Sequence, residues 1–382
     1  MRVLHVVPSF YPAFAYGGTT TSVRALCAAL VRKGCELQVL TTDANGLGEV
    51  LHVEKTSPVD LDGFTVRYFP RIFRHSVSPR LLWQLLPAMR WADIVHLTAV
   101  YNFPTLPTMG ACRWLGKPLV WSPRGALQRW HNSRRPALKA GWEAACRWLA
   151  PPAMVLHVTS SQEAVESGKR FPAAHAFIIP NGVDVPGNVE HCEGDGTLRL
   201  VFLGRLDSKK GIENLLAACA SLEGKLSRRW SLIIAGAGDP SYASGLHEEA
   251  GRLGLGGQVK FAGEVRGEAK TKLFEGTDLA VFPSHTENFA MVVAEALAHG
   301  VPVIASRGTP WAEVENHACG LWVDNDPASL AEAITRMASM PLEVMGARGR
   351  QWMQRDFSWD GIAEAMVGVY GKLVRNFGRN AH

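Results

Sequence analysis

The chain has 382 residues, of which 47% are hydrophobic and 20% are charged, and its formal net charge is +5. This composition is that of an ordinary globular protein and excludes a disordered, collagen-like or coiled-coil chain. At about 100–200 residues per domain, the length predicts two domains. No apolar run reaches the roughly 18 residues that a membrane-spanning helix needs.

The first residues predict a buried strand rather than a secretion signal. The apolar run at residues 3–7 ends at Pro8, whereas a signal peptide needs an apolar region of about 7–15 residues and a cleavage site of small residues. We therefore expect the protein to stay in the cytoplasm. The seven cysteines include no pair with Cys-x-x-Cys spacing, so neither a disulfide framework nor a zinc site is indicated.

Strands alternate with helical segments along the first half of the chain. A loop runs from Pro8 to Gly18, and apolar residues at helical spacing then follow up to Gly34, which suits a helix end. Such alternation indicates a parallel sheet with helices on both faces. Strands are predicted at Val3–Val7, Leu37–Leu40, Ile94–Leu97, Leu119–Trp121 and Met154–Val158.

Turn-forming residues at 180–196 mark a domain boundary, because Pro, Asn and Gly cluster there and the stretch at 193–196 is polar. The alternation then restarts, with a short helix at Ala290–His299 closed by Gly300. Further strands are predicted at Leu198–Leu203, Leu232–Ala235, Val259–Phe261, Leu279–Phe282 and Val303–Ala305.

The end of the chain predicts an amphipathic helix, from the apolar stripe of Ile362, Met366, Val369 or Tyr370, Leu373 and Phe377. We expect residues 356–382 to pack back on an N-terminal domain of residues 1–190, with residues 191–355 as the C-terminal domain. The predicted fold class is α/β, with two Rossmann-like, doubly wound domains. A ligand cleft is expected between them, at the carboxyl ends of the strands.

Positive charge is concentrated in the first domain. Residues 1–190 hold 20 Lys and Arg against 12 Asp and Glu, whereas residues 191–382 hold 20 against 23. Residues 71–148 alone contain 12 basic residues, two acidic residues and seven of the 12 tryptophans. Such a segment favours an anionic partner.

An anionic membrane surface is our hypothesis for that partner, because arginine attracts anionic headgroups and tryptophan prefers the membrane interface. The stretch from Arg124 to Lys139 is the expected contact, through Arg129, Trp130, Arg134 and Arg135. The alternative is that the tryptophans belong to the core and the arginines form a solvated face.

The strongest local signal for chemistry is the segment from Ser284 to Leu297, which follows the predicted strand at Leu279–Phe282. A strand, a polar loop and a helix N-terminus together make an anion site, because the first N–H groups of the helix are unbonded. Glu287 lies in the loop and Glu295 on the helix, and carboxylates of this kind hold sugar diols. Alternatively, both are ordinary solvated or salt-bridged residues.

Two cations, Arg205 and Lys210, follow the strand at Leu198–Leu203 and suit a diphosphate, which they could neutralise without a metal ion. The alternative is a solvated basic turn. Gly17 and Gly18 open the first helix, where glycine lets the backbone approach a phosphate closely. A plain turn is the competing interpretation of these two glycines.

Together and in this order, these segments resemble the family 4 retaining glycosyltransferases, which have the two-Rossmann GT-B fold. The resemblance runs almost from end to end and includes the glutamate pair of the family's E-x7-E element. Its motifs are Tyr16-Gly17-Gly18, Asp93-Ile94-Val95-His96, Ile179 to Asp184, Arg205 with Lys210, Glu287 to Glu295, and Gly300 to Ala305.

The resemblance implies a role for each matching residue. Arg205 and Lys210 would hold the donor diphosphate, Glu295 the donor ribose, and Glu287 the transferred sugar at its reacting face. The remaining donor contacts would come from backbone N–H groups around Asn288, Phe289 and Ala290, and from Gly17 and Gly18 in the other domain.

The implied activity is transfer of a hexose from a nucleotide-diphosphate sugar, with retention at the anomeric carbon and without a metal or other cofactor. The implied acceptor is a glycan or a lipid-diphosphate-linked glycan of surface polysaccharide assembly. We expect a peripheral enzyme on the inner face of the cytoplasmic membrane, and no nucleic-acid partner. Asp324-Asn325-Asp326 has the letters of a metal motif but is interpreted as a turn ahead of Pro327.

One position departs from the family pattern. Arg124 stands in the loop after Leu119–Trp121, where many relatives have a histidine, so the role of that histidine does not carry over. Arg124 could bind an acceptor phosphate or the leaving group of the donor, or it could cap a loop.

Other function classes are less well supported. A nucleotide-sugar epimerase of the same architecture would need carboxylates and a histidine placed for elimination, and a catalytically inactive nucleotide-sugar binding protein would not need the glutamates together with the cations. A dinucleotide dehydrogenase is disfavoured, because no Gly-x-Gly-x-x-Gly follows the first strand.

Overall fold

The computed structural model describes residues 1–46, 48–55, 57–73, 76–128, 135–191 and 195–380. For residues 377–380 it describes the backbone but not the side chains. The chain forms two compact α/β units. Unit 1 comprises Met1–Gly182 together with Trp359–His382, and unit 2 comprises Val183–Ser358. The predicted fold class of two Rossmann-like domains is confirmed.

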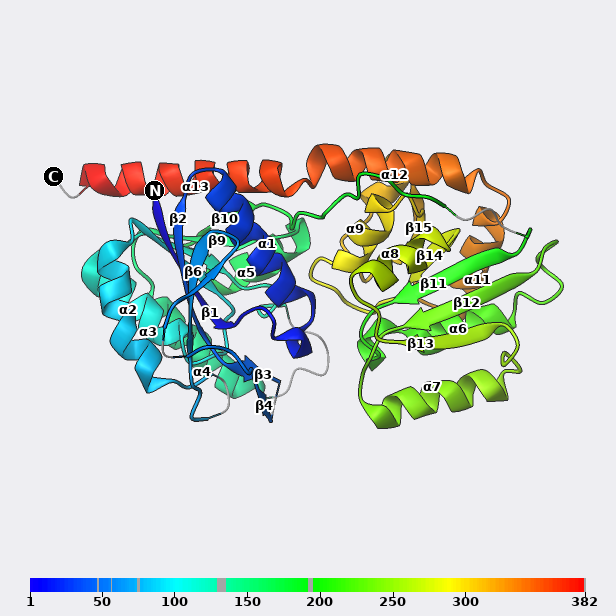
Figure 1. Ribbon diagram of the computed structural model, residues 1–382, viewed down its shortest axis with the longest axis horizontal. Coiled ribbons are helices and arrows are strands. Elements are labelled where there is room, and N and C mark those ends of the chain that lie inside the picture. The colour runs from blue at the N-terminus through cyan, green and yellow to red at the C-terminus, as the bar shows by residue number, and fades with distance from the viewer. Residues whose placement is uncertain (47, 56, 74–75, 129–134, 192–194, 381–382) are drawn as a thin grey trace. The chain divides into compact units, whose positions relative to one another are not determined.

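Unit 1 is built on an eight-stranded sheet in the order β10-β9-β8-β7-β1-β2-β6-β5, parallel except for the pair β5–β6 (Figure 1). A two-stranded ribbon, β3 (Ala44–Asn45) and β4 (Glu49–Val50), lies outside it. The strands of the main sheet are β1 (Arg2–Ser9), β2 (Glu36–Thr42), β5 (Val59–Leu61), β6 (Phe64–Phe69), β7 (Ile94–Thr98), β8 (Leu119–Ser122), β9 (Met154–Val158) and β10 (His175–Ile178).

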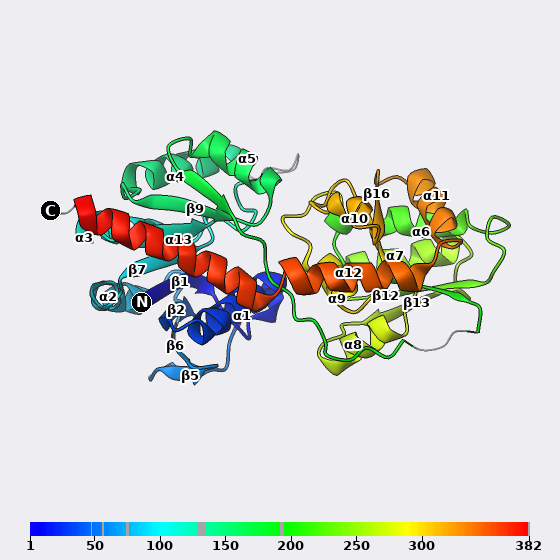
Figure 2. The same ribbon diagram turned by 90° about the horizontal axis from the view of Figure 1, so that it is seen from above.

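Helices cover both faces of this sheet, because alternate residues of each buried strand point to opposite sides. Val3 and Val7 of β1 pack with α1 and α13, whereas Leu4 and Val6 pack with α2, α3 and α4. Figure 2 shows α13 running across the first of these faces. The helices are α1 (Gly18–Arg32), α2 (Pro79–Trp91), α3 (Thr105–Leu115), α4 (Pro136–Leu149), α5 (Ser161–Arg170) and α13 (Trp359–Asn380), with a short 3₁₀ turn at Phe14–Tyr16.

Unit 2 is built on a fully parallel six-stranded sheet in the order β13-β12-β11-β14-β15-β16. Its strands are β11 (Leu198–Leu203), β12 (Trp230–Ala235), β13 (Val259–Gly263), β14 (Leu279–Phe282), β15 (Val303–Ser306) and β16 (Gly320–Val323). Its helices are α6 (Ile212–Ala220), α7 (Pro240–Arg252), α8 (Glu268–Glu275), α9 (Met291–Ala298), α10 (Glu313–Asn316), α11 (Pro327–Met337) and α12 (Leu342–Asp356), with a 3₁₀ turn at Ser208–Lys210.

Backbone contacts set the points at which the chain passes from one unit to the other. The N–H of Val183 donates to the carbonyl of Phe357 at 2.8 Å inside unit 2. Gly182 packs on the ring of Trp359 in unit 1, so closely that a Cβ there would lie 2.5 Å from the ring. The units therefore divide at residues 182 and 358, rather than at the predicted boundaries of 190 and 355.

The last segment of the chain, α13, packs against α1 in unit 1. Its apolar stripe is buried at Ile362, Met366, Val369 and Tyr370, as the helical spacing predicted. The side chain of Phe377 lies outside the described residues.

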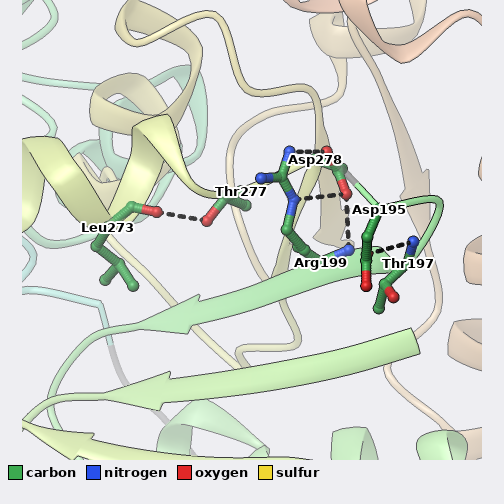
Figure 3. A network of polar contacts seen from close by, with 6 residues as sticks. All are labelled: Asp195, Thr197, Arg199, Leu273, Thr277 and Asp278. Atoms are coloured by element: carbon green, nitrogen blue, oxygen red, sulfur yellow. Dashed lines mark hydrogen bonds and ion pairs between the residues drawn. The ribbon is translucent and has the colours of Figure 1, made fainter. Parts of the chain in front are cut away.

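An ion pair ties the two central strands of unit 2 together where they begin (Figure 3). The guanidinium of Arg199 in β11 donates to both carboxylate oxygens of Asp278, just before β14, at 2.6 and 3.2 Å. The backbone N–H of Arg199 donates to the same carboxylate at 2.7 Å. This fixes β11 beside β14, and the opposite ends of these two strands carry the predicted site residues.

Among the described residues, no helix combines the length and the apolar character that crossing a bilayer requires. The six described cysteines are buried and unbridged, and Cys192 lies outside the described residues.

Candidate functional site

The strand order of unit 2 reverses direction between β11 and β14. In parallel α/β sheets the carboxyl ends of the strands at such a switch point are the usual place for a ligand. The loop after β11 carries Arg205 and Lys210, and the loop after β14 carries Glu287. The fold thus brings two predicted signals to one switch point.

Close backbone packing fixes the loop that carries Arg205. A Cβ on Gly236 would lie 1.7 Å from the carbonyl oxygen of Gly204, and a Cβ on Gly238 would lie 2.0 Å from that of Leu206. The backbone N–H of Leu206 donates to the carbonyl of Ala237 at 2.9 Å. Only glycine fits at 236 and 238. Our sequence reasoning missed both, although Gly-x-Gly directly after β12 is a visible signal.

Lys210 ends the tight turn at Ser208–Lys210, which Asp207 caps. The carboxylate of Asp207 accepts from the N–H of Lys209 at 3.0 Å, and the N–H of Lys210 donates to the carbonyl of Asp207 at 2.8 Å. Gly211 follows with a φ of 62°, and a Cβ there would lie 2.2 Å from the carbonyl oxygen of Pro283. The turn is therefore pressed against the loop after β14.

The side chains of Lys210 and Glu287 form an ion pair across the two loops. Their side chains are 21% and 16% exposed, so the pair is largely shielded but open to a ligand. Oγ of Ser284 donates to the same carboxylate oxygen of Glu287 at 3.0 Å. One carboxylate thus accepts from an ammonium group and a hydroxyl at once.

The loop after β15 supports the backbone of Glu287. Its N–H donates to the carbonyl of Gly308 at 2.8 Å, and a Cβ on Gly308 would lie 2.2 Å from the carbonyl oxygen of Ser284. Neither Ser284 nor Gly308 was predicted as a site residue. Their contacts join segments far apart in the sequence, which local motifs do not reveal.

Glu295 lies on α9 and pairs with Lys270 of α8 at 2.8 Å. Both side chains are partly buried, at 21% and 29% exposed respectively. Lys270 was not predicted, because it precedes Glu295 by 25 residues on a different helix. Glu295 is therefore salt-bridged in this structure, and a ligand hydroxyl would have to share the carboxylate with Lys270.

The residues between the two glutamates shape the start of α9. Ala290 adopts a left-handed conformation with φ of 60°, and α9 spans Met291–Ala298 inside the predicted 290–299. Phe289 is buried against Trp311, whose ring N–H donates to the Phe289 carbonyl. The backbone N–H groups of Phe289 and Ala290 donate no hydrogen bond within the described part of the chain. Asn288 precedes them in the bend.

Arg205 and the acidic motif at 324–326 complete the predicted residues of unit 2. The side chain of Arg205 is exposed and makes no hydrogen bond or ion pair to any described residue. Asp326 caps α11, accepting from the N–H groups of Ala328 and Ser329, in agreement with a turn. No group of three His, Cys, Asp or Glu side chains suited to a metal ion occurs among the described residues.

Unit 1 has its own switch point, between β1 and β7, and a cavity of about 190 Å³ lies there. Gly17, with φ of 69°, caps α1, and Gly18 is its first residue. Neighbouring residues Tyr16 and Thr19 line the cavity, with hydroxyl and amide groups from Ser9, Thr98 and Asn102.

Among the described residues that line this cavity, Arg124 carries the one formal charge. Its φ is 54°, and its guanidinium donates to the side-chain oxygen of Asn181. Its Nε atom has no hydrogen-bond partner within the described part of the chain. The neighbouring N–H of Gly125 donates to the buried Glu163 at 2.5 Å, which fixes the loop. Arg124 thus has donor capacity left for a ligand.

The chain matches two protein families in turn. Residues 16–185 match the family described as Glycosyltransferase Family 4, and residues 190–352 match the family described as Glycosyl transferases group 1. The D-inositol 3-phosphate glycosyltransferase of Streptomyces griseus is 31% identical over 315 residues, which are 72% of this chain and 66% of the relative.

Other curated glycosyltransferases are 32–33% identical over 187–191 residues, and the chain spans less than half of their length. Solved structures of other proteins share the fold. Sucrose-phosphate synthase from Thermosynechococcus elongatus has a TM-score of 0.76 at 22% identity, covering 98% of this chain and 100% of that one. Anabaena HepE in complex with UDP and glucose has a TM-score of 0.73 at 18% identity, covering 97% and 100%. From its sequence and its fold, the chain belongs to the family 4 glycosyltransferases of the GT-B fold.

Proposed function

We propose that the protein is a retaining glycosyltransferase that moves a hexose from a nucleotide-diphosphate sugar to a glycan or lipid-linked glycan, in surface polysaccharide biosynthesis. The observation that carries the proposal is the ion pair of Lys210 and Glu287 at the switch point of unit 2. A cation for a leaving phosphate and a carboxylate for sugar hydroxyls stand side by side there. Family membership supports the same conclusion.

The donor diphosphate is assigned to Arg205 and Lys210. Two preorganised cations stabilise the charge that develops on the leaving phosphate, and this does not require a metal ion or another cofactor. Arg205 has its guanidinium available in solvent. The backbone N–H groups of Phe289 and Ala290, together with Asn288, supply neutral donors, and Gly17 and Gly18 are proposed to approach the phosphate from unit 1.

The sugar and the ribose are assigned to the two glutamates. Glu287 contacts the transferred hexose, and Glu295 accepts from the ribose hydroxyls. Anabaena HepE shares this fold and holds UDP and glucose, which supports a nucleotide-sugar donor. In retention by front-face substitution the leaving phosphate accepts the proton of the acceptor, so the protein needs to orient the substrates and stabilise charge rather than supply a strong base.

The acceptor is assigned to the cavity of unit 1. The guanidinium of Arg124 faces neutral hydroxyl and amide groups there, and its unbonded Nε can take an anionic oxygen. A curated relative is named for D-inositol 3-phosphate, which supports a phosphate-bearing acceptor. We place the reaction in the cytoplasm, at the inner face of the membrane where lipid-linked glycans are extended.

The experiment that tests this function is a panel of nucleotide-sugar donors with mass detection of the released nucleotide and of the product. The acceptor is a lipid extract of the producing cell. We expect one donor to release its nucleoside diphosphate only when acceptor is present, at a rate that excess chelator does not change. Conversion of the nucleotide sugar without acceptor would indicate an epimerase instead. Binding without turnover of any donor would indicate a protein that has lost catalysis.

A further inference from the structure

Three tryptophans of unit 1 lie on its outside. Trp83, Trp114 and Trp148 are 83%, 70% and 76% exposed, whereas Trp121 is fully buried in β8. The tryptophan-rich segment therefore serves more than the core. Among the described residues, nine of the ten exposed large hydrophobic side chains belong to unit 1, and Val344 alone belongs to unit 2. These tryptophans are therefore available for contact with a partner.

The three tryptophans share one layer of helices. Trp83 lies on α2, Trp114 on α3 and Trp148 on α4. Helices α2, α3 and α4 lie next to one another (Figure 1), and α3 contacts both of the others. All three bury apolar residues in the same core against one face of the sheet. We call the outward side of these helices the α2–α4 surface. It lies on the opposite face of the sheet from α1 and α13.

The α2–α4 surface carries positive charge without exposed negative charge. Its exposed cations are Arg80, Arg90, Arg113 and Arg147. The single acidic residue in the three helices is Glu143, which is buried. Its carboxylate accepts from Arg170 at 3.3 Å and from the hydroxyl of Tyr101 at 2.5 Å. The acid is thus neutralised inside the unit, and the exposed arginines have no opposing charge on their own helices.

We infer that the α2–α4 surface binds an anionic lipid membrane. Each indole ring can enter the interface with its N–H still hydrated, while arginines attract the headgroups. A bilayer also suits apolar anchors that are spread singly over three helices, because lipids adjust around each side chain. Membrane binding would bring the enzyme to the lipid-linked acceptor of the proposed function. Only this link to the acceptor rests on the proposed function.

Most of the residues expected to make this contact from composition alone lie outside the described residues. Arg129, Trp130 and Arg134 are outside the described residues, and Arg135 precedes α4 in an exposed position. The α2–α4 surface draws its tryptophans and arginines from residues before and after that stretch, between 80 and 148. The surface can therefore be tested without changing any residue near Arg124.

The test is co-sedimentation of the full-length protein with vesicles of phosphatidylglycerol and phosphatidylcholine, and with vesicles of phosphatidylcholine alone, across a salt series. Arg80→Ser/Arg90→Ser should weaken binding about 25-fold, since each arginine near an anionic surface contributes about fivefold. Trp83→Ser/Trp114→Ser/Trp148→Ser should weaken it about tenfold or more, by removing the interfacial anchors. Because these side chains are exposed, the melting temperature should not change.

A matched control comes from unit 2, where Arg336, Val344 and Arg348 are exposed. Arg336→Ser/Val344→Ser/Arg348→Ser removes two exposed arginines and one exposed apolar side chain from unit 2 and should bind the anionic vesicles as the wild type does. The inference is overturned if the wild type ignores anionic vesicles at low salt, or if it binds neutral vesicles equally well. Binding of both surface variants at wild-type strength also overturns it. The inference is also overturned if the wild type binds an acidic polypeptide resin but no vesicles, and the surface variants lose the binding to the resin. That result would indicate an acidic protein partner.

Turnover with detergent-dispersed acceptor separates this inference from the proposed function. If the surface variants bind vesicles more weakly than the wild type but no donor is turned over, the membrane surface stands and the proposed function fails. If turnover in detergent is normal but vesicle binding is absent, the surface fails and the proposed function stands.

Discussion

Lys210 and Glu287 lie 77 residues apart in the chain, and their side chains form an ion pair at the carboxyl ends of β11 and β14. The pair joins the two loops that leave the switch point of unit 2. Without a ligand, the ammonium group neutralises the carboxylate. A donor diphosphate would compete with Glu287 for Lys210, which would release the carboxylate to bind sugar hydroxyls.

Removal of the cations should lower turnover much more than it lowers stability. Lys210→Ala and Arg205→Ala should each reduce kcat about a hundred- to a thousandfold, the usual loss of about 2.7–4 kcal/mol of transition-state stabilisation for one preorganised group. The control is Lys225→Ala, an exposed lysine of the same unit. Steady-state kinetics measures kcat of each variant, and thermal unfolding measures its stability. Near wild-type rates in both variants would contradict the diphosphate assignment.

The two glutamates should separate in their kinetic effects. Glu295→Gln should raise the donor KM and leave kcat nearly unchanged, because ribose contacts are equal in the ground and transition states. Glu287→Gln should lower kcat more than it changes KM. Initial rates over a range of donor concentrations give both parameters. An identical change of KM and kcat in the two variants would contradict this division of roles.

Gly236 should tolerate no side chain. Gly236→Ala places a Cβ 1.7 Å from the carbonyl oxygen of Gly204, so the loop carrying Arg205 must move, at a cost of about 1–3 kcal/mol in the free energy of unfolding. Gly257→Ala is the matched control, since nothing lies within 4 Å of its Cβ. Urea unfolding measures the free energy of unfolding of both variants. Equal stabilities would show that the close approach is not maintained in solution.

Mild acid should destabilise unit 1 through its buried histidines. Burial lowers the pKa of His5 and of His157 to about 3 and lowers that of His96 well below its usual range. Between about pH 6.5 and these values the unfolded chain binds more protons than the folded chain, so stability falls as the pH falls. His5 and His157 should each contribute a loss of about 2 kcal/mol by pH 5.

Urea unfolding at a series of pH values measures this loss. His157→Gln should reduce the slope, and the comparison at pH 8 controls for the packing change, because the histidines are neutral in both states there. The imidazole of His157 is hydrogen-bonded to the hydroxyl of Ser122 at 2.7 Å and to the carbonyl of Ile179 at 3.0 Å. A free energy of unfolding that stays constant between pH 7 and 5 would contradict burial of these rings.

Continuous apolar runs made the central strands predictable. The predicted strands at Met154–Val158, Leu198–Leu203 and Leu279–Phe282 match β9, β11 and β14 residue for residue. Both faces of such strands are covered, so nearly all of their side chains are apolar, with His157 in β9 and Arg199 in β11 as the exceptions. Strand β10 was missed, because three of its four residues are exposed at the edge of the sheet. Strand β6 was missed as well, because its apolar residues are interrupted by Thr65 and Arg67.

The candidate site was predictable only where its signal is local. Lys210 and Glu287 each follow an apolar strand, so the strand positions indicate that they share an edge of the sheet. The supporting contacts of Lys270 with Glu295 and of Gly308 with Glu287 join separate segments, whereas Ser284 contacts Glu287 within the same loop. Pairing of Glu295 with Lys270 depends on how α8 packs beside α9, which no spacing within one element can indicate.

Calorimetric titration with nucleoside diphosphates tests the donor site at Lys210 and Glu287 most directly, since it needs no knowledge of the acceptor. UDP, GDP and ADP are titrated in turn into the wild type, Lys210→Ala and the control Lys225→Ala. The account predicts that one nucleotide binds the wild type and the control equally and binds Lys210→Ala at least about tenfold more weakly, as expected for loss of a charged hydrogen bond. Undiminished binding to a folded Lys210→Ala, or no binding of any nucleotide to the wild type, would contradict it.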